Sequence, residues 1–163
     1  MTSLKSRLEG KPRHRVTYLV QVADTTDAEA ALDVARRAVA LLELTGAQND
    51  ESRDDDLTQA RAEQQDATAA LSACYEPVVF VALSNLDMER IESAHQDAKG
   101  ELDRSTIGPV LAAACAEDED LQDAEWWRAQ LAGEQWSMGD KDSLVTTLLT
   151  LNWHTPPASL PKG

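Results

Sequence analysis

The sequence is poor in aromatic residues. Phe, Trp and Tyr together make up 4% of its 163 residues, and Phe80 is the single phenylalanine. A hydrophobic core must therefore be built from Leu, Val and Ala, and the abundant alanine favours helices that approach each other closely. A chain of this length fits one compact domain, or one domain with a projecting element.

Cysteine is also scarce. Cys74 and Cys115 stand alone, without a CxxC motif, so the sequence indicates neither a disulfide framework nor a zinc site. We expect both to be small buried apolar residues in a reducing cytosol, and we expect no cofactor.

Long hydrophobic runs are missing. No apolar stretch approaches the ~20 residues that span a membrane. Residues 1–15 also lack the apolar stretch and cleavage site of a secretory signal. We therefore expect a soluble protein of the cytoplasm that has no membrane partner.

Positive charge is scarce outside the first fifteen residues. The formal net charge is −14, although residues 1–15 carry five cations against the single acid Glu9. An acidic body repels nucleic-acid phosphates and anionic lipid heads, so we expect no nucleic-acid partner. We interpret residues 1–15 as a basic flexible leader; the alternative is a docking arm for nucleic acid or protein.

Catalytic and metal-binding motifs are missing as well. The sequence contains no GxSxG, GxxxxGK[ST] or GxGxxG. His14, His95 and His154 are far apart and none has the spacing of a metal ligand pair. The prediction is that the chain is not an enzyme and binds no metal.

Two β-branched runs, residues 16–22 and 78–83, have the composition of short strands. Between them, segments 27–45 and 57–74 repeat small or apolar residues at alternating spacings of three and four, which is typical of helices that pack lengthwise. The seam positions are Ala28, Leu32, Ala35, Val39 and Leu42, then Leu57, Ala60, Gln64, Ala67, Leu71 and Cys74. We predict an antiparallel helical hairpin with an exposed connection at 47–56, and antiparallel pairing of the strands.

Local signals predict the ends of the hairpin helices. Thr26 and Glu29 have the spacing of a capping box. Gly46 stands where a left-handed C-cap is expected, and Pro77 predicts the end of the second helix.

Short helices are predicted after the second strand. Ser84, with Asp87 three residues later, predicts the start of one helix. Ser105 or Thr106 is expected to begin the next, with Pro109 in its first turn.

Two further helices are predicted near the C-terminus. Their inward positions are Leu121, Ala124, Trp127 and Leu131 in one, and Leu144, Leu148 and Leu151 in the other, which begins at Ser137. The predicted fold class is mainly α with a small antiparallel β element: strand, helical hairpin, strand, then a bundle of short helices. The predicted segments are the leader at 1–15, the strand–hairpin–strand unit at 16–83, the helical bundle at 84–155 and a Pro-rich tail at 156–163.

All four tryptophans (Trp126, Trp127, Trp136 and Trp153) fall within the last 38 residues. Adjacent helical positions point about 100° apart, so Trp126 and Trp127 are not both expected to face one narrow core stripe. One interpretation is that the tryptophans wrap a small core. The other is that one of them is a partly exposed anchor for a partner, a role in which tryptophan is enriched. The candidate partner-binding residues are Trp126, Trp127 and Trp136.

The order of these elements resembles that of the tail assembly chaperones of long-tailed bacteriophages that infect actinobacteria. The resemblance covers roughly residues 16–160 and is carried by short motifs. They are the segment 83–95, the small-residue helix 109–115, Glu125-Trp126-Trp127, Leu131, Gly133-Glu-Gln-Trp136 and Leu151-Asn152. Two departures are Leu131-Ala132-Gly133, where the family usually has Leu-Ser-Asp-Gly, and Ile107-Gly108-Pro109, where an aromatic-plus-Pro pair is common.

The resemblance implies a chaperone that binds the long helical tape-measure protein and keeps it soluble until tail-tube subunits polymerise around it. It implies a role in the host cytoplasm and absence from the mature virion. Further implied partners are the tail-tube subunit, which displaces the chaperone, and a longer frameshifted form of the chain itself. The hairpin is in addition a candidate surface for a homo-oligomer.

The family commonly produces its longer form by a ribosomal slip near the end of the short reading frame. Leu160-Pro161-Lys162 can be encoded with a slippery heptamer, C-CCA-AAG. The alternative is an ordinary Pro-rich tail.

Other functions stay open at this point. One is an acidic phage regulatory or inhibitor protein that occupies a nucleic-acid-binding surface of a host protein. Another is a structural head–tail joining component that remains in the particle. A tail-tube gene upstream and a very long tape-measure gene downstream would favour the chaperone.

Overall fold

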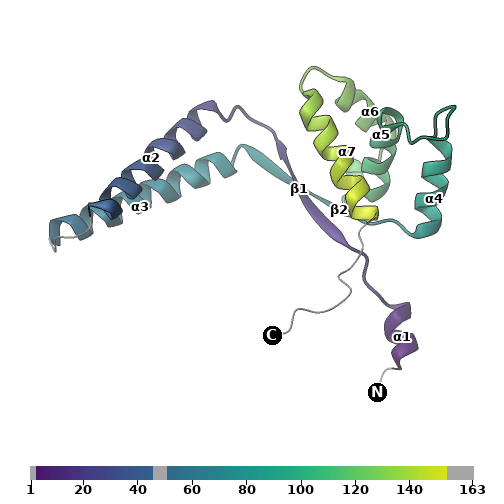
Figure 1. Cartoon of the computed structure of the whole chain (residues 1–163), viewed down its shortest axis with the longest axis horizontal. Coiled ribbons are helices and arrows are strands. Elements are labelled where there is room, and N and C mark those ends of the chain that lie inside the picture. Colours follow the sequence, from purple (N-terminus) through teal and green to yellow (C-terminus); the bar gives the residue numbers. More distant parts are fainter. Residues whose placement is uncertain (1–2, 46–50, 154–163) are drawn as a thin grey trace. The chain divides into compact units, whose positions relative to one another are not determined.

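The computed structural model describes residues 3–45 and 51–153, apart from the side chains of residues 51–53. Its elements, shown in Figure 1, are α1 (Leu4–Glu9), β1 (Arg15–Gln21), α2 (Thr26–Leu44), α3 (Glu51–Ser72), β2 (Tyr75–Val81), α4 (Asn85–Ala94), α5 (Arg104–Cys115), the 3-10 turn η1 (Glu119–Leu121), α6 (Ala124–Ala132) and α7 (Met138–Asn152). The described part is mainly helical with one two-stranded antiparallel sheet. The predicted fold class and the predicted order of elements are confirmed.

The chain divides into two compact units. One comprises residues 1–18 and 78–163, and the other comprises residues 19–77. The division falls inside both strands, unlike the predicted segments 16–83 and 84–155. The segment predicted as a flexible leader contains the helix α1, where the Ser3 hydroxyl accepts a hydrogen bond from the Ser6 amide at 3.2 Å.

Several sequence predictions lie outside the described residues. They concern the C-cap at Gly46, the first part of the connection at 47–50, the Pro-rich tail at 156–163 with its proposed slip near codons 160–163, and His154.

The register of the two strands is set by backbone hydrogen bonds. The Ala82 amide donates to the His14 carbonyl at 2.9 Å, and the Val22 amide donates to the Cys74 carbonyl at 2.9 Å. Hydrogen-bonded and non-hydrogen-bonded positions alternate along an antiparallel pair, and this register places Pro77 at a non-hydrogen-bonded position, where the backbone N and carbonyl point away from β1. Its missing N–H therefore costs no hydrogen bond to β1. The prediction that Pro77 directly ends the second helix is wrong, because that helix ends at Ser72 and Pro77 lies within β2.

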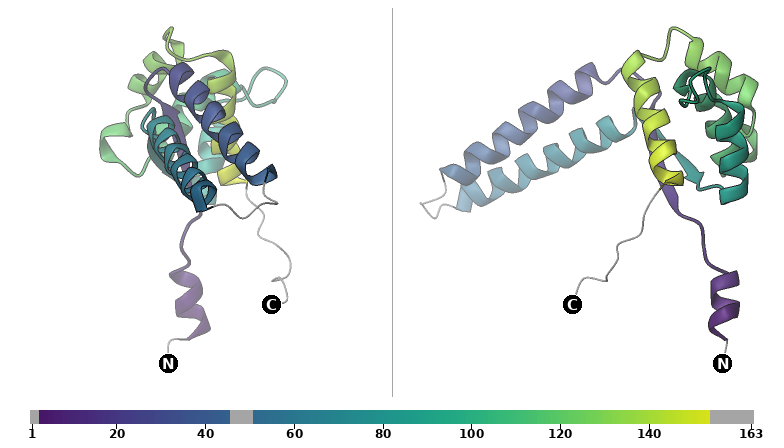
Figure 2. Two further views of the ribbon diagram at one scale, coloured as in Figure 1. Left: turned by 90° about the vertical axis from the view of Figure 1, so that its left-hand side faces the viewer. Right: turned by 45° about the vertical axis from the view of Figure 1, so that its right-hand side comes forward.

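Helices α2 and α3 pack against each other as an antiparallel hairpin (Figure 2). Every predicted seam position is buried or half-buried, and all other described side chains of α3 are exposed. Arg61 and Glu43 form an ion pair between the two helices, with Nη2 and Oε1 3.0 Å apart. The sequence periodicity therefore identified the contact surface of the hairpin.

The ends of the hairpin helices differ from the predictions. Helix α3 begins at Glu51, so residues 51–56 of the predicted connection are helical. Acidic residues near a helix N-terminus are favoured by the helix dipole, which explains this extension. The capping box of Thr26 and Glu29 is not formed. The N-cap is Thr25, and the Asp24 carboxylate accepts hydrogen bonds from the Thr26 amide and hydroxyl at 2.9 and 2.7 Å.

The unit that contains α4 to α7 has a continuous hydrophobic core. Helix α5 packs against α4, α6 and α7. Val16 and Tyr18 of β1 and Val78 of β2 pack against this core. The core itself consists of Phe80, Ala82, Met88, Ile107, Leu111, Ala112, Ala113, Cys115, Ala116, Trp127, Leu131, Leu144, Val145, Leu148, Leu149 and Leu151. The inward positions predicted for the last helix are thus confirmed.

Caps account for most helix starts in this unit. The predicted starts at Ser84 and Ser137 are confirmed, and Ser137 forms a complete capping box with Asp140. The start predicted at Ser105 or Thr106 is wrong. Asp103 is the N-cap, because its carboxylate accepts from the Ser105 amide at 3.0 Å.

Helix α5 therefore begins before the predicted position, and Pro109 lies in its second turn instead of its first. Proline has no N–H, so the Ser105 carbonyl lacks its usual donor four residues later. The preceding residue, Gly108, is buried against α7, and a Cβ atom placed on it would lie 2.7 Å from Val145 Cγ2. Glycine at this position allows the close approach of α5 and α7.

Candidate functional site

The tryptophan pair of α6 is positioned by an N-terminal cap. The Asp123 carboxylate accepts hydrogen bonds from the amides of Glu125 and Trp126 at 2.9 and 3.0 Å. The cap places both tryptophans in the first turn of α6, where they point in different directions, as predicted.

Trp127 is the centre of an aromatic cluster. Its side chain is 2% exposed, and its Nε1–H donates to the Leu121 carbonyl at 2.8 Å, which satisfies the buried donor. Three rings surround it, with centroid distances of 5.0 Å to Trp126, 6.3 Å to Trp136 and 6.2 Å to Phe80. The structure therefore brings together the three tryptophans predicted as partner-binding residues.

The three tryptophans differ in what they offer a partner. Trp127 belongs to the core and has almost no surface for binding. Trp136 is half-buried against the same core. Trp126 is 41% exposed and touches the edge of Trp127 in a nearly perpendicular arrangement, with an interplanar angle of 81°. Among the three, Trp126 is the accessible candidate anchor.

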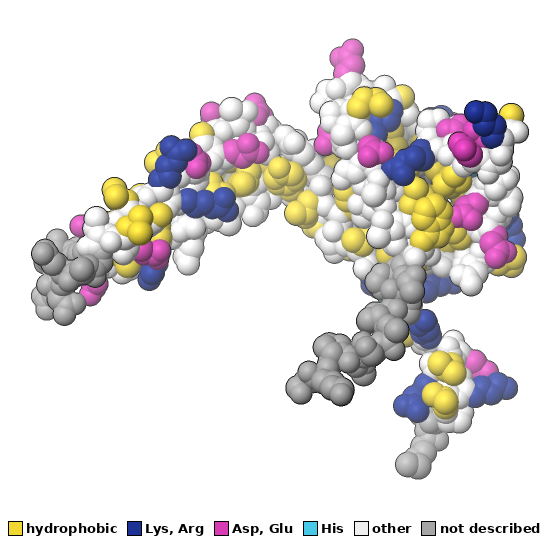
Figure 3. Space-filling model, in the orientation of Figure 1, with side chains coloured by type: hydrophobic (Ala, Val, Ile, Leu, Met, Phe, Trp, Pro, Cys, Tyr) yellow, Lys and Arg dark blue, Asp and Glu magenta, His cyan; other side chains and the backbone are white. Residues whose placement is uncertain are grey.

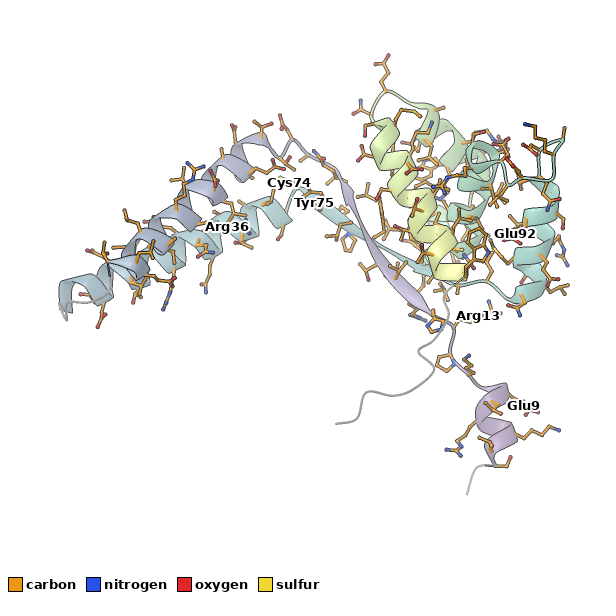
Figure 4. All side chains as sticks on the ribbon, viewed as in Figure 1. Glu9, Arg13, Arg36, Cys74, Tyr75 and Glu92 are labelled. Atoms are coloured by element: carbon orange, nitrogen blue, oxygen red, sulfur yellow. The ribbon has the colours of Figure 1, made fainter. Side chains whose placement is uncertain are left out.

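Trp153 is a further exposed tryptophan of the described chain. It is the C-cap of α7 and is 55% exposed. Its Nε1–H donates to Oε1 of Glu92 at 2.7 Å, and Figure 4 labels this glutamate on α4. Trp153 belongs to no aromatic pair with Trp126 or Trp127 in the described structure.

A groove with a volume of about 390 Å³ lies between α5, α6 and α7. It is lined by Arg104, Ser105, Gly108, Pro109, Arg128, Leu131, Ala132, Met138, Lys141, Asp142 and Val145. The lining combines small and apolar residues with three cations. No sequence motif pointed to this groove, because its signal is weak: small residues in α5 and α6, and three cations in an otherwise acidic region.

Comparisons with protein-family models, with curated proteins and with solved structures find no match.

The motif Leu151-Asn152 has a structural role that the sequence did not reveal. Oδ1 of Asn152 accepts from the Leu83 amide at 2.8 Å. Its Nδ2 donates to the Leu148 carbonyl at 2.8 Å and lies 3.4 Å from Sγ of Cys115. Asn152 thus connects the end of α7 to the backbone that follows β2.

Perturbed pKa values in the described residues arise from capping and burial. Hydrogen bonds from Thr26 lower the pKa of Asp24, and hydrogen bonds from Ser105 lower the pKa of Asp103. Burial raises the pKa of the Cys115 thiol, and the Asn152 hydrogen bond opposes this shift. Each of these effects is explained by local structure, so none of them identifies a catalytic group.

His95, Cys74 and Cys115 lie in different parts of the described chain. Nδ1 of His95 lies 3.1 Å from Oγ1 of Thr106. Cys115 is buried as expected, whereas Cys74 is only half-buried at the junction of α3 and β2 (Figure 4). Within residues 3–45 and 51–153, no group of three or more His, Cys, Asp or Glu side chains is arranged to hold a metal ion. In the same residues, no helix has the length and apolar character required to cross a membrane.

Proposed function

We propose that this chain is a tail assembly chaperone that binds a helical tape-measure protein before the tail tube forms around it. The observation that carries the proposal is the geometry of Trp126. Its ring is partly exposed, yet its edge contact with the buried Trp127 holds it in place. A large aromatic side chain that is ordered before binding loses little conformational entropy on contact, which suits an interface anchor.

The motif resemblance supports the same function. Glu125-Trp126-Trp127, Leu131 and Trp136 belong to the closing pattern of the chaperone family. The three tryptophans of this pattern form the aromatic cluster with Phe80, and Leu131 lies in the same hydrophobic core. Trp127 and Leu131 are core residues, so their place in the pattern is explained by folding. Trp126 is the residue of this set whose exposed surface suits binding.

The surface composition also fits a chaperone. The net charge of −14 favours solubility of the chain and of a complex that it coats. Figure 3 shows hydrophobic side chains exposed among charged ones on the displayed face. A small contact centred on one aromatic anchor gives modest affinity, which would allow the tail-tube subunit to displace the chaperone. Many copies on one long client would then provide avidity.

Co-expression tests the proposed function. The full chain is produced together with a fragment of the tape-measure protein from the same phage, and the soluble fraction of the fragment is measured. Wild-type chain is expected to keep the fragment soluble, and Trp126→Ala is expected to reduce this effect.

Trp153→Ala is the matched control, because Trp153 is at least as exposed but lies outside the aromatic cluster. It is expected to behave like wild type. Thermal unfolding of both variants shows whether they still fold. A fragment that is insoluble with wild-type chain argues against the function, and equal effects of the two folded variants argue against Trp126 as the anchor.

A further inference from the structure

The groove between α5, α6 and α7 has a charge opposite to that of the chain. The whole sequence has 15 Lys and Arg against 29 Asp and Glu. The residues that line the groove include the cations Arg104, Arg128 and Lys141 but only one carboxylate, Asp142. The groove is therefore a local positive region on an acidic protein.

The cations of the groove are not held in strong ion pairs within the described chain. Arg104 donates to Oδ1 of Asp142 at 2.8 Å and to Oγ1 of Thr146 at 2.7 Å, and Arg128 pairs with Glu125 three residues earlier. Exposed ion pairs of this kind contribute little net free energy, so a competing carboxylate can exchange with them. Lys141 has no ion-pair partner in the part of the chain that the structure describes.

The floor of the groove is apolar. Pro109, Leu131, Ala132 and Val145 contribute apolar surface, and Met138 at the rim is 79% exposed. A volume of about 390 Å³ lies at the small end of the range for ligand sites and has room for a few apolar side chains. Methionine is flexible and polarisable, which suits adaptable contact with side chains of different shapes.

We propose that this groove binds a helical segment of a partner protein in which large apolar side chains are flanked by carboxylates. The apolar side chains occupy the floor, as in other helix-in-groove complexes, and the carboxylates face Arg104, Arg128 and Lys141. This inference names the class of client segment, and it rests on the proposed chaperone function for the identity of the partner.

The groove and Trp126 are separate contacts on α6. Arg128 follows Trp126 by two positions, which corresponds to about 200° around a helix. The two side chains therefore lie on nearly opposite sides of α6. Variants at one contact leave the other in place, so the two can be tested independently.

The probes are three fluorescent helical peptides of about 18 residues, long enough to be partly helical in isolation. The first has leucines on one face flanked by Glu, the second has the same leucines flanked by Lys, and the third has Glu with the leucines replaced by Ser. Binding to the full chain is measured by fluorescence anisotropy at low and high salt.

The Glu–Leu peptide is expected to bind at least about 10-fold more tightly than each of the other two, and salt is expected to weaken its binding. Equal affinities of the Glu–Leu and Lys–Leu peptides would overturn the proposed charge preference. Equal affinities of the Glu–Leu and Glu–Ser peptides would overturn the proposed apolar contact.

Charge reversal locates the binding site. Lys141→Glu is expected to weaken the Glu–Leu peptide about 10-fold or more. The matched control is Lys99→Glu, an exposed cation in the turn after α4 that does not line the groove, and it is expected to have less than about a 2-fold effect. Lys141 is half-buried, so its charge reversal can also affect folding. Met138→Asp changes a residue at the exposed rim of the groove and is therefore a second test, which is also expected to weaken binding. If none of the groove variants differs from Lys99→Glu, the peptide binds elsewhere and the inference is wrong.

The co-expression assay separates this inference from the proposed function. If Lys141→Glu keeps the tape-measure fragment soluble and the acidic peptide does not bind, the groove inference fails while the chaperone function stands. If the peptide binds in the groove but wild-type chain leaves the fragment insoluble, the chaperone function fails and the binding chemistry of the groove stands.

Discussion

Replacing Gly108 by Ala tests the close packing of α5 on α7. The added Cβ would lie 2.7 Å from Cγ2 of Val145, well inside ordinary van der Waals contact. Val145 is buried and β-branched, and it has one strongly preferred rotamer in a helix, so it cannot easily move away. Overpacking of this kind costs about 1–3 kcal/mol, whereas Ala instead of Gly within a helix gains about 1 kcal/mol. With the middle of the overpacking range, we expect a net loss of about 1 kcal/mol in the free energy of unfolding.

A double-mutant cycle isolates this contact. Val145→Ala alone removes two buried methyl groups and should cost about 2 kcal/mol. In the double variant, the methyl group of the new alanine at position 108 fills part of the space left by Val145. The loss of stability in the double variant should therefore be smaller than the sum of the two single losses by about 1 kcal/mol or more. Urea denaturation followed by circular dichroism measures each free energy.

Gly139→Ala in the first turn of α7 is the matched control. The nearest atom to its added Cβ is Oγ of Ser137 at 3.7 Å, an ordinary contact. This substitution is expected to be neutral or slightly stabilising, because alanine has the higher helix propensity. If Gly108→Ala is equally harmless, or if the cycle shows no coupling, the account of α5–α7 packing is refuted.

Three further predictions concern single groups. Asn152→Ala removes the acceptor of the Leu83 amide and is expected to cost about 1–3 kcal/mol in urea denaturation; a loss near zero would show that this hydrogen bond is dispensable. The folded-state pKa of Asp103 lies below its usual 3.8, so its carboxylate stabilises the fold at neutral pH and loses this effect as the pH falls through that lower value. The stability difference between wild type and Asp103→Ala should therefore narrow in acid, and a constant difference between pH 7 and about pH 3 would contradict the capping role. Burial raises the pKa of Cys115, so a thiol reagent should modify Cys74 first and reach Cys115 only on unfolding, whereas equal rates would contradict the buried position.

The helical hairpin could be predicted from sequence because its signal is repeated. Each turn of α2 and α3 contributes a seam position, so one ambiguous residue such as Gln64 does not hide the period. The strands that flank the hairpin were identified by β-branched composition, and their pairing follows because the hairpin returns the chain to its start.

Helix ends were predicted less well because several neighbouring side chains compete for the same free amides. At the start of α2, Asp24 bonds to Thr26, and at the start of α5, Asp103 precedes the predicted caps Ser105 and Thr106. A carboxylate is a stronger acceptor than a hydroxyl, so the aspartate decides the boundary in α5. Pro109 was misplaced for the same reason, since its turn depends on where α5 begins.

The candidate site could be predicted only in part. The concentration of tryptophans and the 100° between adjacent helical positions correctly separated Trp126 from Trp127, but they did not show which of the two is buried. That depends on the position of Phe80 and Leu121, which meet Trp127 through tertiary contacts. The groove depends on the packing of three helices, and no local pattern in the sequence encodes it.

The central claim is that the chain binds the tape-measure protein and leaves before the tail is complete. Quantitative mass spectrometry tests it most directly, applied both to material purified on the tagged chain from infected cells and to virions from the same culture. The account predicts that the tape-measure protein co-purifies with several copies of the chain, and that the chain is absent from the virions. Purification without the tape-measure protein, or a stoichiometric amount of the chain in the virion as expected of a head–tail joining component, would contradict the account.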